Sequence, residues 1–353
     1  MKRTIVLKVN PEKPEAEKIR VAAKIIRRGG LVAFPTETVY GLGADALNPE
    51  AVTQIYLAKK RPLDNPIIVH VASENDVYRL AENVPEKARR LMSVFWPGPL
   101  TLVLKAKDIV PKATTGGLDT VAVRMPNLRV ALALIKESRV PIAAPSANLS
   151  GKPSPTTAEH VKQDLYGRID LILDAGPTEV GVESTVLDLT MDPPQILRPG
   201  GVSYEALSEV LGRVELHPTV VADREISLVH ARSPGMKHKH YAPKAKVIVV
   251  EGEPEAVRRK VQELAEEHRK NGRSVGVLAT DENKRFYKAN VIKSLGARRD
   301  LSSAARNLFK MLREFDEEKV DIIIAESVPI EGLGLAVMNR LRKASGFNIV
   351  KAD

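Results

Sequence analysis

The sequence predicts two consecutive α/β domains joined by a linker. The chain has 353 residues, more than one hydrophobic core usually organises. Strand-like apolar runs interleave with helical patterns along most of it, which indicates sheets covered by helices. In residues 245–353 strands and helices alternate one by one, which is typical of a parallel sheet. We therefore expect a mixed α/β domain over residues 1–215, a linker over 216–244 and a smaller α/β domain over 245–353.

Local signals place the elements of the first domain in order. Gly29 and Gly30 end the first helix, Asn48 and Pro49 provide a cap and a first residue for the second, and Pro97 ends the fourth. Apolar and β-branched runs mark the strands. We expect strands at residues 4–9, 31–34, 65–71, 100–105, 120–125, 170–174, 184–189 and 195–198, and helices at 14–28, 49–60, 75–82, 85–95, 127–138, 157–165 and 203–211.

The second domain follows a simpler pattern. Buried-type strands are predicted at residues 246–250, 274–279 and 321–325, and helices at 254–270, 302–317 and 333–344. No Gly-x-Gly-x-x-Gly turn follows any of these strands, so dinucleotide binding is not expected there.

Composition and charge limit the functional classes. With 43% hydrophobic and 28% charged residues the chain reads as globular, and no apolar run is long enough to span a membrane. The basic amino terminus lacks the features of a secretory signal, so we expect a cytoplasmic protein. The absence of cysteine excludes disulfides and thiolate chemistry. The net charge of +10 is spread as +3, +3 and +4 over residues 1–216, 217–244 and 245–353, which does not favour a dedicated nucleic-acid surface.

The stretch from Leu31 to Asp45 is the strongest candidate for a site. Its apolar run ends at Pro35, which lacks a backbone donor, so Thr36, Glu37 and Thr38 should lie at the carboxyl end of a strand. Open α/β sheets bind ligands at that end. Gly41 and Gly43 should permit positive φ angles and close backbone approach. An ordinary strand-to-helix connection remains an equal alternative for residues 36–43.

Other candidate residues each have a structural alternative. Lys59 and Arg61 end a helix, where the dipole alone favours cations, or they project toward a polyphosphate. Ser146 and Asn148 are ordinary turn residues unless they bind a ligand. His70 in an apolar strand is by default a core histidine.

Arg124 differs, because a buried guanidinium requires a carboxylate partner. The chain contains no Walker sequence, no Gly-x-Ser-x-Gly elbow and no zinc-type histidine pair in its first domain. The residues alone therefore predict a basic, hydroxyl-rich anion pocket.

Ordered motifs make the chain resemble the YrdC-like family in its long, two-domain form. They are Pro35-Thr-Glu-Thr-Val-Tyr-Gly-Leu42, Lys59-x-Arg61-Pro62, Asn65-Pro66, Ser146-Ala-Asn-x-Ser-Gly151 and Ser184-Thr-Val186. The resemblance covers essentially the whole chain. It implies a mixed, twisted-sheet catalytic domain followed by a smaller Rossmann-like α/β/α domain.

The activity that the resemblance implies is a nucleotidyl transfer. L-threonine, bicarbonate or CO2, and ATP would give L-threonylcarbamoyladenylate and pyrophosphate, with Mg²⁺ carried by the ATP phosphates and no dedicated metal site. The product would pass to the transferase machinery that modifies position 37 of certain tRNAs, with at most a weak contact to tRNA itself.

The resemblance also assigns site residues. The threonine set is Thr38, His70, Arg124, the backbone of Ala144, and Ser184. The ATP set is Lys59, Arg61, Asn65, Thr120, Ser146, Asn148, Ser154 and Arg198, in which Lys59 and Arg61 lie nearest the phosphates and are the expected catalytic residues.

The linker is too rich in His, Lys and Tyr for a passive spacer. Our hypothesis is a lid, in which Lys237, His238, His240 and Tyr241 close over the first domain's pocket, against the alternative of static packing between the domains.

Two other functions stay open on the sequence alone. One is an RNA-binding module without turnover, which the diffuse charge disfavours. The other is carbamoyl transfer in hydrogenase maturation, where related domains accompany cysteine-rich zinc motifs, and this chain has no cysteine.

Overall fold

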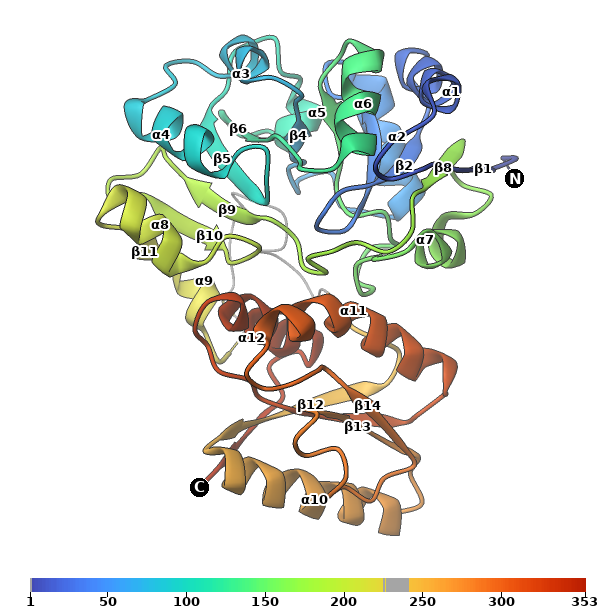
Figure 1. The fold of residues 1–353 in the computed structure, drawn as a ribbon, viewed down its shortest axis with the longest axis vertical. Coiled ribbons are helices and arrows are strands. Elements are labelled where there is room, and N and C mark those ends of the chain that lie inside the picture. The colour runs from blue at the N-terminus through green and yellow to red at the C-terminus, as the bar shows by residue number, and fades with distance from the viewer. Residues whose placement is uncertain (1, 225, 227–240) are drawn as a thin grey trace. The chain divides into compact units, whose positions relative to one another are not determined.

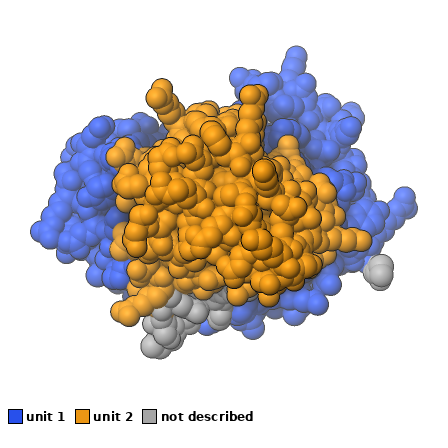
Figure 2. All heavy atoms as spheres, turned by 90° about the horizontal axis from the view of Figure 1, so that it is seen from below, with its two compact units in different colours: residues 1–150, 154–220, 227–237 blue, residues 151–153, 221–226, 238–353 orange. Residues whose placement is uncertain are grey.

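The computed structural model describes residues 2–224, 226 and 241–353, and these residues separate into two units. Unit 1 comprises residues 2–150 and 154–220 of the described part. Unit 2 comprises 151–153, 221–224, 226 and 241–353. Figure 1 shows the elements of each unit, and Figure 2 colours the two units separately. No described helix is both long enough and apolar enough to cross a bilayer.

Unit 1 is built on a mixed sheet of eleven strands. Their order is β1-β8-β2-β3-β7-β4-β6-β5-β9-β10-β11, with parallel and antiparallel neighbours in the same sheet. The mixed character predicted from the sequence is therefore confirmed. The strands are β1 Ile5–Lys8, β2 Val32–Pro35, β3 Tyr40–Asp45, β4 Val69–His70, β5 Leu100–Lys105, β6 Thr120–Arg124, β7 Ile142–Ala143, β8 Leu171–Asp174, β9 Thr185–Asp188, β10 Gln195–Arg198 and β11 Glu215–Leu216.

Helices cover both faces of this sheet, and β2 shows how the sequence divides between the faces. Its residues alternate, so that Val32 and Phe34 join a core beneath α1 and α6, whereas Leu31 and Ala33 join the larger core on the other side. Figure 1 shows α1 and α6 lying together. The helices of unit 1 are α1 Ala16–Arg27, α2 Pro49–Lys59, α3 Glu74–Leu80, α4 Glu86–Phe95, α5 Lys112–Thr115, α6 Arg129–Ser138, α7 Ala158–Leu165, α8 Tyr204–Leu211 and, at the boundary with unit 2, α9 Pro218–Val221.

The stretch that follows β2 differs from its prediction. Residues 40–45 form β3, antiparallel to β2, so the Thr36–Thr38 loop is the turn of a hairpin and Pro35 still pairs with Tyr40. Gly41 and Gly43 do not have positive φ angles, so that part of the prediction is wrong. The close approach is confirmed, because a Cβ on Gly43 would lie 2.8 Å from carbon atoms of Ile142 and Phe34. Glycine is needed here for space between strands.

Unit 2 is a five-stranded, entirely parallel sheet in the order β14-β13-β15-β12-β16. Helix α10 packs on one face, and α11 and α12 pack together on the other, as Figure 1 shows. The predicted α/β/α layering is confirmed. Its elements are β12 Lys246–Gly252, α10 Pro254–Lys270, β13 Val275–Ala279, β14 Val291–Ser294, α11 Leu301–Glu317, β15 Ile322–Glu326, α12 Leu333–Ala344 and β16 Ile349–Ala352.

A buried carboxylate fastens the loop after β13. Glu326 ends β15 and is 0% exposed. It accepts the backbone N–H of Thr280 at 2.6 Å, the side-chain amide of Asn283 at 2.8 Å and the hydroxyl of Tyr287. Burial and the charge of Glu326 raise the pKa of Tyr287, so its hydroxyl stays a donor. The cluster holds residues 280–287 against the carboxyl ends of the central strands.

Candidate active site

A threonine-centred turn shapes the β2–β3 hairpin. Thr36 Oγ1 donates to the carbonyl oxygen of Val39 at 2.7 Å and accepts the backbone N–H groups of Thr38 and Val39. Such side-chain-to-backbone bonds stabilise tight turns. The turn holds Glu37 and Thr38 at the carboxyl end of β2, as predicted, and both side chains are buried.

Arg124 ends β6 with its guanidinium in this buried turn. Its Nη2 donates to Glu37 Oε1 at 2.6 Å, its Nη1 to Thr38 Oγ1 at 2.9 Å and its Nε to the carbonyl oxygen of Gly98 at 3.3 Å. Glu37 Oε2 in turn accepts the backbone N–H of Asn127 at 2.9 Å. The carboxylate partner predicted for Arg124 is therefore confirmed, and it is Glu37.

His70 lies beside Arg124, because the two residues are register partners in the parallel pair β4–β6. Burial, followed by the nearby charge of Arg124, lowers the pKa of His70 from 6.5 to about 3. Its ring packs edge-on against Phe34, and its Nδ1 has no hydrogen-bond partner among the described residues. His70 is thus a neutral imidazole with one nitrogen available to a ligand.

The neutral state of His70 makes stability depend on pH. Its pKa is lower in the folded than in the unfolded chain, so its contribution is complete above about pH 6.5 and is lost as the pH falls toward about 3. We expect the free energy of unfolding of the native protein, relative to a His70→Gln variant, to fall by about 1 kcal/mol per pH unit below 6.5. Denaturant titrations between pH 7.5 and 5 measure this difference. If the free energy of unfolding depends on pH in the same way in both proteins, His70 is not a buried, neutral imidazole.

Lys59 joins the end of α2 to the loop after β7. Its side chain is 1% exposed, and its ammonium donates to the backbone oxygens of Ser146 and Asn148. In the same loop Ser146 Oγ donates to Asn148 Oδ1 at 2.5 Å, and Asn148 Nδ2 donates to the Leu149 oxygen at 2.8 Å. Lys59 therefore organises this loop as well as bringing a positive charge to it.

Arg61 lies just beyond α2, where Lys60 has adopted a left-handed conformation. Its Nη2 donates to the backbone oxygens of Asn65 at 3.2 Å and Pro66 at 3.0 Å. Asn65 is buried, and its Oδ1 has no hydrogen-bond partner within the described part of the chain. The structure thus brings together Arg61 and Asn65, two residues of the predicted ATP set.

Ser184 and Arg198 form a second polar corner next to β9 and β10. Arg198 donates through Nε and Nη2 to the Ser184 carbonyl oxygen at 3.2 and 3.0 Å, and Ser184 Oγ lies 2.8 Å from Thr101 Oγ1. Glu183, the residue before Ser184, accepts a hydrogen bond at Oε1 from Ser154 Oγ at 2.6 Å. A Cβ on Gly200 would lie 2.3 Å from the Glu183 oxygen, so glycine is required at that contact.

Backbone pairing connects the hairpin turn to the loop held by Lys59. Leu42 N–H donates to the Pro145 oxygen at 2.8 Å, and Ala147 N–H to the Tyr40 oxygen at 2.8 Å. Ala144 N–H donates to the Ile68 oxygen at 2.9 Å, two residues before His70. Thr38, His70, Arg124 and Ala144 consequently belong to one region of unit 1 with the Ser146–Asn148 loop.

Thr120 is placed differently from the threonine set. It begins β6, whereas Arg124 ends it, so about 13 Å of strand separates the two residues. The extended segment from Asn65 to His70 runs parallel to β6 at its end. A site containing both Arg124 and Thr120 therefore has to extend along β6.

Most of the predicted lid lies outside the described residues, namely Lys237, His238 and His240. Tyr241 is described, in unit 2, where its ring lies 5.2 Å from that of Phe309 and 5.7 Å from the guanidinium carbon of Arg340. The closing of a lid stays a prediction.

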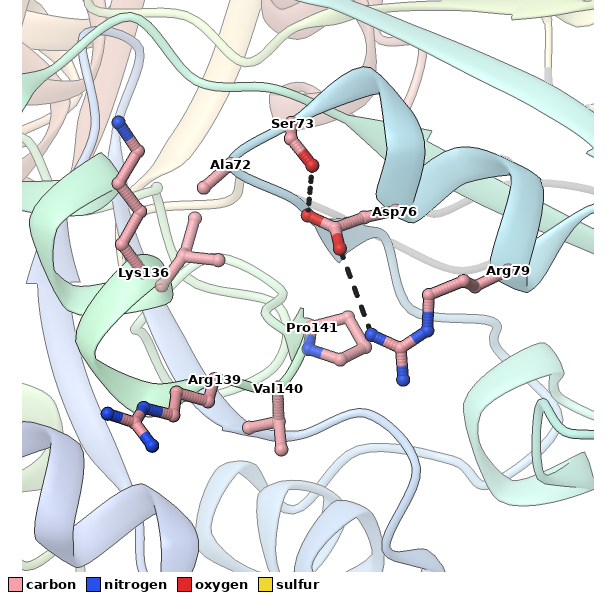
Figure 3. A pocket seen from close by; sticks show the side chains of 9 residues that line it. Ala72, Ser73, Asp76, Arg79, Lys136, Arg139, Val140 and Pro141 are labelled. Atoms are coloured by element: carbon pink, nitrogen blue, oxygen red, sulfur yellow. Dashed lines mark hydrogen bonds and ion pairs between the residues drawn. The ribbon is translucent and has the colours of Figure 1, made fainter.

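A separate hollow of about 190 Å³ lies where α6 ends and α3 begins. Figure 3 shows Arg79, Lys136 and Arg139 around it, with Asp76 accepting a hydrogen bond from Ser73 at 2.9 Å. None of the predicted site residues lines it. Its cations lie at helix ends, where the helix dipole favours them.

Sequence reasoning placed Glu37 in the candidate stretch but did not identify it as the partner of Arg124, and it missed Glu183. Glu37 was visible in the Pro35–Leu42 motif, and the need of Arg124 for a carboxylate was the signal that pointed to it. Glu183 had no such signal, because its partner Ser154 lies 29 positions away in the chain.

The described residues contain no group of three or more His, Asp and Glu side chains arranged to hold a metal ion.

Comparison with known proteins matches both units. Residues 24–200 match the family Sua5_yciO_yrdC, described as telomere recombination, and residues 202–346 match the family described as threonylcarbamoyl-AMP synthase, C-terminal domain. A threonylcarbamoyl-AMP synthase of Pyrococcus abyssi is 54% identical over 99% of this chain and 99% of its own length. One of Bacillus subtilis is 52% identical over 94% of each chain.

A solved structure is similar along the same length. The crystal structure of P. abyssi Sua5 complexed with L-threonine superposes with a TM-score of 0.95 at 54% identity, covering 99% of this chain and 100% of that one.

Proposed function

The chain belongs to the Sua5/YciO/YrdC family, and on that premise we propose that it converts L-threonine, bicarbonate or CO2, and ATP into L-threonylcarbamoyladenylate and pyrophosphate. It is a nucleotidyltransferase-type enzyme, and its full-length relatives are named threonylcarbamoyl-AMP synthases. The observation that best supports this chemistry is the buried Arg124 beside a neutral His70, in the same unit as Lys59 and Arg61. One part of the site suits an amino acid and another suits a polyphosphate.

The amino-acid end would be formed by Thr38, His70 and Arg124. A guanidinium with its planar fork matches a carboxylate, and the available nitrogen of His70 can hydrogen-bond the substrate without adding charge. The backbone of Ala144 and the hydroxyl of Ser184 complete the predicted contacts. Free threonine carries an ammonium group near neutral pH, so this group has to release a proton to water before the amine can attack CO2.

The transfer step would occur at the α-phosphate. The free amine bonds to the carbon of CO2 and releases a second proton to water, which gives a carbamate. A carbamate oxygen then bonds to the α-phosphorus, and the bond from that phosphorus to the pyrophosphate oxygen breaks. Such transfers depend mainly on positioning and on neutralising charge. Arg61 and Lys59 are the cations we assign to the phosphates, and the remaining predicted ATP residues hold the nucleotide.

Mg²⁺ in this proposal is bound to the phosphates of ATP and to water. Magnesium usually keeps several waters and uses few protein ligands, so the ATP phosphates can supply most of its remaining bonds. It would neutralise charge on the departing pyrophosphate.

The same proposal extends to the fate of the product. The adenylate would pass, in the cytoplasm, to the transferase machinery that modifies tRNA, with at most a weak tRNA contact by this chain. A mixed anhydride hydrolyses in water, so direct transfer would favour product yield.

Pyrophosphate release tests the function directly. The assay contains the full chain, Mg²⁺, ATP, L-threonine and bicarbonate, and each component is omitted in turn. Release that depends on all three substrates supports the proposal. Binding of tRNA with no release under any condition would instead support an RNA-binding module.

Serine should be a poor but measurable substitute for threonine. The two substrates differ by one methyl, and burying a methyl in an apolar niche is worth about 1–3 kcal/mol. We therefore expect kcat/KM for threonine to exceed that for serine by tens to hundreds of fold in the pyrophosphate assay. Equal values would show that the site does not contact the methyl group.

A further inference from the structure

Glu37 is the buried carboxylate that faces Arg124, and neither the sequence motifs nor the comparisons give it a role. We propose that Glu37 is a positioning residue, which orients Arg124 so that a fixed pair of N–H donors is presented to the carboxylate of the amino-acid substrate. The inference rests on the proposed function, because it takes Arg124 as the group that receives that carboxylate.

A count of donors gives the first step. A guanidinium has five N–H donors. In Arg124 one on Nε, one on Nη1 and one on Nη2 bond to Gly98, Thr38 and Glu37. One N–H on each Nη therefore remains, which is the number that the two oxygens of a carboxylate require for a bidentate pair.

The surroundings of Glu37 give the second step. Its Oε1 accepts from Arg124 and its Oε2 from the backbone of Asn127, and the side chain is about 5% exposed. Its own carbonyl oxygen accepts the N–H of Val180 at 2.8 Å. Both carboxylate oxygens thus face protein donors, so Glu37 acts on the substrate through Arg124.

Thr38 also fixes the orientation of the Arg124 guanidinium. Its hydroxyl accepts from Arg124 Nη1 and lies 2.8 Å from Thr36 Oγ1, which itself donates to the Val39 oxygen. This chain of hydrogen bonds runs one way, from Arg124 through Thr38 and Thr36 to the backbone. Glu37 and the hydroxyl chain therefore hold two different nitrogens of the fork, which fixes its rotation.

Charge gives the last step. An isolated buried guanidinium is costly, and Glu37 compensates it without occupying the two remaining donors. Without Glu37, Arg124 can turn toward other acceptors, and the donor pair is no longer aligned. The loss should be specific to substrates that carry a carboxylate.

The test compares L-threonine with L-threoninamide, which keeps the amine, hydroxyl and methyl but lacks the negative charge. Pyrophosphate release gives kcat/KM for each in the native enzyme and in Glu37→Gln. We expect kcat/KM for threonine divided by kcat/KM for threoninamide to fall at least about tenfold in the variant, mainly through a higher KM for threonine. The dissociation constant for ATP should change less than about threefold. Glu37→Asp, which keeps the charge, should restore part of the ratio.

Asp170→Asn is the matched control. It removes a partly buried carboxylate of unit 1 whose Oδ2 accepts the N–H of Leu31 at 2.8 Å. The threonine-to-threoninamide ratio should not change in this variant. If Glu37→Gln does not fold, Glu37→Asp carries the test, with an expected fall of at least about threefold.

The outcomes separate the inference from the function. A threonine-to-threoninamide ratio that stays constant in folded Glu37 variants overturns the positioning role. An equal loss for both substrates does the same, because threoninamide has no carboxylate for Arg124 to receive. Absence of threonine-dependent release in the native enzyme would instead refute the proposed function.

Discussion

Arg61→Ala should slow pyrophosphate release at least about 10²-fold while the protein remains folded. Its guanidinium donates to the backbone oxygens of Asn65 and Pro66 and is assigned to the phosphates. Charge on the phosphates develops during the transfer, so an aligned cation stabilises the transition state more than the bound substrate. Initial rates at saturating ATP and threonine measure the effect, and thermal unfolding reports the fold.

Lys60→Gln provides the comparison for Arg61→Ala. Lys60 is an exposed neighbour with the same charge, and its removal should leave the rate nearly unchanged. Lys59→Ala should slow the reaction at least as much as Arg61→Ala and should also destabilise the fold, because the buried oxygens of Ser146 and Asn148 lose a charged donor. Near-normal turnover in folded Arg61→Ala would refute the assignment.

Arg124→Ala should abolish measurable threonine binding. It removes the group that is proposed to receive the carboxylate, and it also leaves Glu37 buried without its cation, which costs about 3–5 kcal/mol of stability. Calorimetric titration with threonine measures the affinity. Unchanged affinity in a folded variant would rule out Arg124 as the carboxylate partner.

A double variant separates binding from folding at this position. In Arg124→Ala combined with Glu37→Gln the buried negative charge is gone, so part of the lost stability should return. Threonine binding should not return with it. Recovery of both would mean that Arg124 acts on threonine only by maintaining the fold.

Local sequence signals predicted the helices that are specified by their own caps and apolar repeats. Helix α2 begins at Pro49, and Asn48 caps it by accepting the Ala51 N–H at 3.0 Å, as expected from those two residue types. Helices α10 and α12 have the predicted bounds because their apolar faces repeat with helical period.

The missed strands depend on pairing instead. β3 contains two glycines, which disfavour strands locally, and it forms because β2 and β7 lie on either side of it. β14 and β16 are four-residue edge strands with one partner each, and their sequences carry no long apolar run. Tertiary contacts, not propensity, decide such segments.

The candidate site divides in the same way. Residue types and motif spacing identified Lys59, Arg61 and Arg124, because a cation in a buried or phosphate-facing position has few alternatives. They could not show that Lys59 also supports a loop, or that Thr120 lies at the far end of β6 from Arg124. These facts depend on how distant segments meet.

The carboxyl ends of β12 and β15 determine whether unit 2 can bind a nucleotide. The chain leaves these neighbouring strands toward opposite faces of the sheet, through α10 and α12, and doubly wound proteins bind phosphate-bearing cofactors at such a divergence. Here both strand ends present carboxylates, Glu251 paired with Arg342 and Lys351, and Glu326 enclosed by the loop that carries Tyr287. A nucleotide approaching this edge would find Arg342 and Lys351 already paired with Glu251, and the end of β15 covered by the loop that Glu326 holds. We therefore expect one ATP per chain at saturation, with all of it bound by unit 1.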